Sequence, residues 1–235
     1  MTDRLLGRWR GRTVACAASG PSISAEDLQL VRSAGVPLIC VNNTWRLAPW
    51  ADMVVAMDTA WWKHYGAELQ AGFAGERVGY TSQAPKFGAG YTVHGTMLHS
   101  FGNSGALAVA VAVRGRAERV LLLGFDCLPR EDGQMHWHGN HPAPLSNPHM
   151  SINRWPQQFE RVAKHAREQR VAVINCSRRT ALKCFERQTL EEALRTATSS
   201  ATSGSSTSEA SGTRTPARPP GGTDTRPGPS PAAAT

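Results

Sequence analysis

The stretch Thr13-Val14-Ala15-Cys16-Ala17-Ala18, followed at once by Ser19-Gly20-Pro21-Ser22, decides the fold. The first six residues are small and apolar, which is typical of a strand buried on both faces of a parallel sheet. The Gly-Pro turn cannot continue this strand. Ser24 then begins a helix that contains Leu28 and Val31, with Asp27 as the capping-box partner of Ser24. These residues therefore predict a strand, a turn and a helix in succession.

The same alternation continues along the chain. Further strands are predicted at 37–41, 52–56, 119–123 and 170–175, and further helices at 59–72, 104–113 and 151–169. Residues 76–102 contain many glycines, and we place no element there. Strands that are apolar throughout and separated by helices predict an α/β fold. We expect a doubly wound, mainly parallel, Rossmann-like sheet in one domain, with helices on both faces.

The two ends of the chain differ from this core. Residues 1–12 carry four arginines and are interpreted as a basic, solvated N-terminal arm. Residues 13–195 form the predicted nucleotide-binding domain. Residues 196–235 consist almost entirely of Thr, Ser, Ala, Gly and Pro, and such a segment cannot bury enough apolar surface to offset the entropy of ordering it. We expect this tail to be disordered.

Charge and composition narrow the classes of protein. The chain has a formal net charge of +8, and the tail holds three arginines and two carboxylates, so +7 belongs to residues 1–195. Such a balance favours nucleotides, nucleic acid or acidic lipids as partners. No apolar run approaches the roughly 18 residues of a membrane span. The five cysteines include no CxxC pair, and the N-terminal arginines precede no apolar stretch. We therefore expect a reduced, cytoplasmic protein.

Polar residues follow each predicted strand. They are Ser19 to Ser22, Asn42-Asn43, Asp58, Asp126 and Asn175-Cys176-Ser177. Ligands of open parallel sheets bind outside the carboxyl ends of the strands, so these residues are the candidate site. The Ser19–Ser22 turn could hold a phosphate with its amides, although it matches neither the Walker A nor the GxGxxG pattern. Helix capping and turn formation explain the same residue types equally well.

Several motifs in order carry a resemblance to known families. They are the Ser-Gly-Pro-Ser strand end, Val41-Asn42-Asn43, Asn103-Ser104-Gly105 before a helix of small residues, Leu123-Gly124-Phe125-Asp126, and a later loop histidine. Over residues 13–180 the chain resembles the small bacterial sialyltransferases of the Campylobacter and Haemophilus type. It is also similar to the related hydroxymethylpterin diphosphokinase (MptE-like) family. Short, tailed chains of this kind also resemble proteins of bacteriophage genomes.

The resemblance implies a nucleotide-dependent transferase, most simply a glycosyltransferase that uses a CMP-sugar-like donor and no metal cofactor. Ser19, Gly20, Pro21 and Ser22 would line the phosphate end of the nucleotide, and Asn42 would contact the donor. Ser104 and Gly105 would hold the sugar or its carboxylate, and Asp126 the ribose or the acceptor side. His149 would act as the general base on an acceptor hydroxyl, for which an imidazole that titrates near neutral pH is suited. Helix N-termini with Arg46 or Lys63 would stabilise the leaving group.

Two departures from the sialyltransferases keep alternatives open. Asp58 stands where they place an amide-bearing residue, and their pair of tyrosines has no obvious counterpart. In a pyrophosphokinase-like transferase, Asp58 and Asp126 could instead hold Mg²⁺. A non-catalytic module that binds nucleotides or nucleic acid is a further alternative.

Histidine and tryptophan are concentrated in two places. The segment His136-Trp137-His138-Gly139-Asn140-His141 could bind a transition metal, contact the ligand or acceptor, or form an ordinary surface loop. Its spacing is not a recognised zinc pattern, and we assign it no metal. Trp45, Trp50, Trp61 and Trp62 are explained either as core residues or as an aromatic wall for an acceptor.

Overall fold

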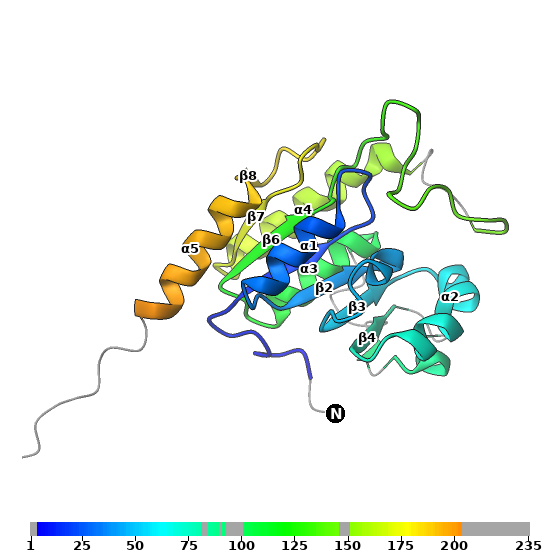
Figure 1. Cartoon of the computed structure of the whole chain (residues 1–235), viewed down its shortest axis with the longest axis horizontal. Helices are drawn as coiled ribbons and strands as arrows, with labels where there is room; N and C mark the ends of the chain where they lie inside the picture. Colours follow the sequence, from blue (N-terminus) through cyan, green and yellow to red (C-terminus); the bar gives the residue numbers. More distant parts are fainter. Residues whose placement is uncertain (1–3, 81–83, 90, 93–100, 146–150, 204–235) are drawn as a thin grey trace, which may run out of the picture.

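The computed structural model describes residues 4–80, 84–89, 91–92, 101–145 and 151–203. In these residues one parallel sheet has the strand order β5-β4-β3-β2-β1-β6-β7-β8 (Figure 1). The strands are β1 (Thr13–Ala17), β2 (Leu38–Val41), β3 (Met53–Ala56), β4 (Glu76–Gly79), β5 (Tyr91–Thr92), β6 (Arg119–Leu123), β7 (Ala172–Asn175) and β8 (Glu186–Arg187). The helices are α1 (Ala25–Ser33), α2 (Thr59–Gly72), α3 (Ser104–Arg114), α4 (Trp155–Glu168) and α5 (Leu190–Ser203). The doubly wound α/β fold predicted from the sequence is confirmed.

The first strand–turn–helix unit forms as its residues predict. Residues Val14 to Ala17 of β1 are fully buried. At the start of α1, the Asp27 backbone donates to the Ser24 hydroxyl, and the Ser24 backbone donates to the Asp27 carboxylate. This capping box satisfies two N–H groups that the first turn would otherwise leave without acceptors.

Helices cover both faces of the sheet because side chains alternate along each strand. Val14, Cys16 and Leu122 point to the face covered by α3 and α4. Their neighbours, such as Ala15 and Leu121, point to the other face, which α1, α2 and α5 cover. Nearly all the described residues of α3 are buried, because alanine and valine allow a helix to lie close against a sheet. Strands β2 and β3 are therefore apolar throughout, as are β1 and β6 after their first residues.

The N-terminal segment was expected to be a solvated basic arm, but two of its side chains are buried. Leu5 and Trp9 are only 1% and 2% exposed, and the Trp9 amide donates to the Gly115 carbonyl at 2.8 Å. Residues 4–12 thus pack on the domain, because two large apolar side chains among the arginines gain more from burial than from solvation. Arg8 forms an ion pair with Glu76.

Other boundaries also differ from expectation. The strands β4, β5 and β8 were not predicted, because β5 and β8 have two residues each and β4 (Glu76-Arg77-Val78-Gly79) contains a single large apolar residue. The last helix, α5, runs to Ser203, so the chain is helical beyond the predicted boundary at residue 195. The rest of the predicted tail, 204–235, lies outside the described residues.

None of the helices in the described part of the chain has the length and apolar character that crossing a bilayer requires. Three of the four clustered tryptophans are buried in the core: Trp61 and Trp62 belong to α2, and Trp45 follows β2. None of the four lines the pocket described below. Their interpretation as core residues is confirmed.

Candidate functional site

A pocket of about 480 Å³ lies at the carboxyl ends of β1, β2, β3 and β6. The chain adds β2 to β5 on one side of β1 and β6 to β8 on the other, so the strand order reverses between β1 and β6. At such a reversal the two following helices lie on opposite faces and leave a crevice between them. The pocket occupies this place, and its volume is in the range of small-molecule sites.

Most of the predicted site residues meet in this pocket. Those that line it are Ser19, Gly20, Asn42, Asp58, Ser104, Gly105, Asp126, His136 and His141. Pro21, Ser22, Trp137 and His138 do not line it, and His149 lies outside the described residues. Sequence reasoning missed the wall contributed by the start of α4, which includes Arg154, Trp155 and Gln158.

Asp126 connects two sides of the pocket floor. Its carboxylate accepts a bond from the Ser22 amide at 2.9 Å and another from the Ser22 hydroxyl at 2.7 Å. Asp126 is only 2% exposed, and the loss of water raises its pKa, although the bonds from Ser22 and the charge of Arg179 oppose this effect. A Cβ at Gly20 would overlap the Gly124 carbonyl and this carboxylate, so only glycine fits there.

The turn that was expected to cradle phosphate is therefore engaged within the protein. The Gly20 amide donates to the Gly124 carbonyl at 2.9 Å, and the Ser22 amide donates to Asp126. Pro21 has no amide proton to offer. In this arrangement the Ser19–Ser22 turn presents few donors to a ligand and lies against a carboxylate.

The start of α3 forms the opposite wall. Asn103 caps the helix by accepting from the Ala106 amide at 2.8 Å, and its side-chain nitrogen donates to Gln158 of α4 at 2.7 Å. The Ser104 hydroxyl accepts from the Met57 amide at 3.0 Å, which fixes the end of β3 to α3. Ser104 and Gly105 occupy the first two helical positions, where backbone N–H groups have no acceptor within the helix.

Two residues at the ends of β2 and β3 offer acceptors that have no hydrogen-bond partner among the described residues. Asn42 has φ of +50°, a conformation that asparagine tolerates better than most residues, and its Oδ1 is buried without a hydrogen-bond partner. Asp58 precedes α2 without making a side-chain capping bond. Nearby protein atoms remove part of its water and raise its pKa.

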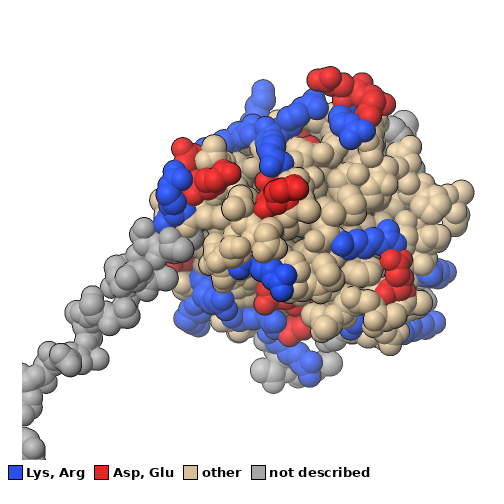
Figure 2. Space-filling view, viewed as in Figure 1, with Lys and Arg blue, Asp and Glu red and all other residues tan. Residues whose placement is uncertain are grey.

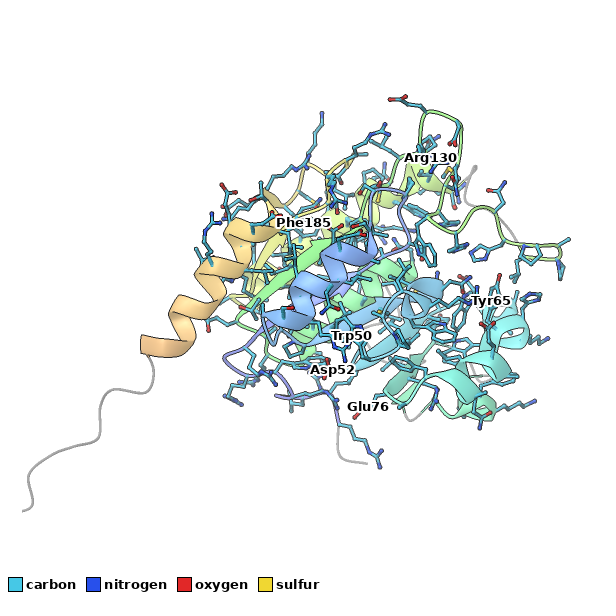
Figure 3. The ribbon with its side chains drawn as sticks, in the orientation of Figure 1. Trp50, Asp52, Tyr65, Glu76, Arg130 and Phe185 are labelled. Atoms are coloured by element: carbon cyan, nitrogen blue, oxygen red, sulfur yellow. The ribbon has the colours of Figure 1, made fainter. Side chains whose placement is uncertain are left out.

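The predicted histidine cluster lies over α2 beside the pocket. The rings of His136, His138 and His141 have centroids between 4.9 and 5.2 Å apart. Tyr65 of α2 bonds to His141 Nδ1 at 3.2 Å, and Figure 3 labels Tyr65 on α2 at the side of the molecule where this loop lies. Burial lowers the pKa of His138 to about 4, with smaller effects from His141 and Arg46.

Three interpretations of this cluster were open. Within the described ranges, no group of three or more His, Cys, Asp or Glu side chains is arranged to hold a metal ion. His136 and His141 line the pocket, whereas the Trp137 backbone donates to Ser19 at 3.0 Å and its ring packs on the core. A role in ligand contact is therefore open to His136 and His141 by position.

The two cations that we expected to stabilise a leaving group do not line this pocket. Arg46 donates to Glu68 at 2.9 Å and lies over the Tyr65 ring at 4.9 Å. Lys63 lines a separate hollow between α2 and Leu145. Arg154 is the one lysine or arginine that lines the pocket in the described part of the chain.

No protein-family model matches the chain, and no curated protein matches it. Among solved structures, one likeness is to the TTHB071 protein from Thermus thermophilus, in a structure soaked with ZnCl₂. The two chains share 14% identity, with 69% of this chain and 55% of that chain covered and a TM-score of 0.20. The chain thus spans about half of that protein, and a similarity this low supports no argument.

Proposed function

We propose that the chain is a nucleotide-dependent transferase, most simply a glycosyltransferase that moves a sugar from a CMP-sugar-like donor to an acceptor hydroxyl. The observation that carries the proposal is the gathering of Ser19, Asn42, Asp58, Ser104 and Asp126 in one pocket at the reversal of strand order. These residues are far apart in the chain, and each of them follows a strand or begins a helix. Nucleotides are the ligands that such crevices most often bind.

In the proposed reaction the acceptor oxygen attacks the anomeric carbon of the sugar. The bond from that carbon to the phosphate oxygen breaks, its electron pair stays on the phosphate, and the hydroxyl proton passes to a base. His149 is the proposed base on sequence grounds, and it follows soon after the histidines of the pocket wall. We extend the proposal to a cytoplasmic location, in the host cytoplasm if the gene is carried by a phage.

The pyrophosphokinase alternative rests on Asp58 and Asp126, which line the same pocket. Mg²⁺ binds one or two carboxylates together with substrate phosphates. Both Asp126 oxygens already accept bonds from Ser22, whereas Asp58 makes no capping bond, so Asp58 is the carboxylate more available to Mg²⁺. We derive no step through a metal ion.

The non-catalytic alternative is a module that binds nucleic acid. A basic surface would support it, because phosphate contacts supply most non-specific affinity. On the face seen in Figure 2, acidic and basic side chains are interspersed. Several arginines are also paired with carboxylates, as in the ion pairs Arg8–Glu76 and Arg178–Asp27. This face therefore offers no extended basic surface.

Thermal unfolding with CMP, CDP, UDP, GDP and ATP, each with and without Mg²⁺, tests the proposal. A ligand that binds only the native state raises the melting temperature. At a ligand concentration of 100 times its Kd, it adds about 2.7 kcal/mol to the free energy of unfolding. Stabilisation by CMP without Mg²⁺ supports the glycosyltransferase, and stabilisation by ATP only with Mg²⁺ supports the kinase alternative. If no nucleotide raises the melting temperature, the proposal is wrong.

Asn42→Gly identifies the pocket as the place of binding. Glycine accepts the positive φ of residue 42, so the variant removes the buried acceptor without backbone strain. The matched control is Asn140→Gly, on an exposed position that does not line the pocket. The first variant should weaken nucleotide binding about fivefold to tenfold and the control should not. Equal affinities in both variants would place the nucleotide elsewhere.

His149→Ala tests the base. The variant should lose turnover of the donor and keep nucleotide binding, because a base acts on the acceptor and not on the nucleotide. Unchanged turnover would remove His149 from the mechanism and leave the proposed transferase intact.

A further inference from the structure

The polar groups that line the pocket fall into two sets, according to whether the protein already uses them. The Ser19 hydroxyl contacts Thr44 at 2.9 Å, and the Ser104 hydroxyl accepts from Met57. Asp126 accepts twice from Ser22. These groups hold the walls of the pocket together. A ligand would depend on the polar groups that no protein atom engages.

Arg154 is the strongest donor in the second set. Its side chain is exposed, and no hydrogen bond or ion pair engages it within the described residues. The backbone is helical from Ile152 into α4, so Arg154 lies one turn before Gln158 on the same side of the helix. Gln158 bonds to Asn103, the cap of α3. Arg154 therefore lies on the wall that faces the start of α3.

The α3 end of the pocket attracts anions for a second reason. The Ser104 and Gly105 amides are without helical acceptors, and the helix dipole places partial positive charge there. Arg154 lines the same pocket, and its guanidinium provides both the charge and the fork of donors that phosphate oxygens prefer. The Ser19–Ser22 turn carries no cation, its Gly20 and Ser22 amides are engaged, and the Asp126 carboxylate lies against it.

The acceptors lie elsewhere in the pocket. The buried Asn42 Oδ1 and the Asp58 carboxylate follow β2 and β3, and each suits a hydroxyl or amino group. A ligand that satisfies all these groups has an anionic end and an end rich in hydrogen-bond donors. A nucleotide has both, since its phosphate is anionic and its ribose and base carry hydroxyl and amino groups.

We propose that Arg154, with the Ser104 and Gly105 amides, binds the phosphate of the donor nucleotide and stabilises the negative charge left on it when the sugar is transferred. The proposal rests on the proposed function for the identity of the ligand. It assigns the phosphate to the α3–α4 side of the pocket and not to the Ser19–Ser22 turn. Asn42 then contacts the nucleoside part of the ligand.

Calorimetric titration of the full chain with CMP and with cytidine tests this assignment. The wild-type protein should bind CMP more tightly than cytidine. Arg154→Gln should weaken CMP binding about 10-fold to 100-fold, the usual worth of a hydrogen bond to a charged group, and change cytidine binding less than about twofold. Arg154→Lys should give an intermediate loss, because lysine keeps the charge and lacks the fork.

Arg161→Gln is the matched control. Arg161 lies two turns further along α4, is exposed, and does not line the pocket. The control should bind both ligands as the wild type does. Equal losses of CMP affinity in the Arg154 and Arg161 variants would indicate a general effect of charge and overturn the assignment.

Inorganic pyrophosphate separates failure of this proposal from failure of the proposed function. If CMP binds and Arg154→Gln binds it equally well, the Arg154 assignment is wrong and the transferase proposal stands. If no nucleotide binds but pyrophosphate binds and requires Arg154, the anion site stands and the transferase proposal is wrong. If neither CMP nor pyrophosphate binds, both are wrong.

Discussion

The Asp126–Ser22 contact joins the two strands beside the reversal of strand order, and its energetic contribution can be measured. Asp126→Ala removes the acceptor of two hydrogen bonds, of 2.9 and 2.7 Å, and leaves the Ser22 amide without a partner. Bonds to a charged group contribute about 1.5–3 kcal/mol each, and removal of a desolvated carboxylate offsets part of the loss. We expect a net loss of about 3 kcal/mol.

In a domain of this size, 1 kcal/mol changes the melting temperature by about 2–4 °C. Asp126→Ala should therefore unfold about 6–12 °C below the wild type in circular dichroism at neutral pH. Ser22→Ala removes only the hydroxyl bond and should cost about 1.5 kcal/mol, or about 3–6 °C. The control Asp132→Ala removes an exposed carboxylate paired with Arg130 and should melt within about 1 °C of the wild type.

The double variant provides the decisive comparison. Because both substitutions remove the same hydroxyl bond, Ser22→Ala should cost less than about 0.5 kcal/mol in a chain that already carries Asp126→Ala. Additive losses would show that the two side chains do not interact. A loss below about 0.5 kcal/mol for Asp126→Ala alone would refute the view that this contact holds the pocket floor.

Three more outcomes follow from the described residues. Burial raises the pKa of Asp126 above its ordinary value of 3.8, so ionisation of this carboxylate lowers the stability of the wild type as pH rises from that value through the folded-state pKa. The melting temperature of Asp126→Asn should therefore increase relative to that of the wild type as pH rises above 3.8, and a constant difference would contradict this. Trp62→Ala should cost about 3–5 kcal/mol in urea unfolding, since the side chain is fully buried and donates to Ala56; a loss below about 1 kcal/mol would contradict its core position. In an NMR titration of the native protein, His138 should stay neutral down to about pH 4, and a midpoint near 6.5 would show that the ring is exposed to water.

Local signals in the sequence predicted the elements whose energetics are local. The capping box of Ser24 and Asp27, the apolar strand from Thr13 and the small-residue helix after Asn103 all form as expected. Strands β5 and β8 have only two residues each and depend on pairing with β4 and β7, so no periodicity could have indicated them. The prediction that the N-terminal segment is solvated was wrong, because it relied on the four arginines and gave no weight to Leu5 and Trp9, which are buried.

The candidate site was predictable in position and not in detail. Parallel strands that alternate with helices bring their carboxyl ends to one edge, so Asn42, Asp58 and Asp126 could be grouped from the sequence. Which polar groups remain available to a ligand depends on hydrogen bonds between distant residues, such as Ser22 with Asp126 across 104 positions. Arg154 lies at the pocket only because α4 packs on the start of α3 through Gln158 and Asn103.

By itself, the sequence determined the α/β class, the first strand–turn–helix unit and the set of strand-end residues, because periodicity, capping and turn chemistry act over a few neighbouring residues. The tertiary structure decided which side of the pocket can receive an anion. That choice depends on long-range contacts that engage the Ser19–Ser22 turn and leave Arg154 and the α3 amides available. Such contacts form only when the sheet is assembled and distant segments compete for the same donors and acceptors.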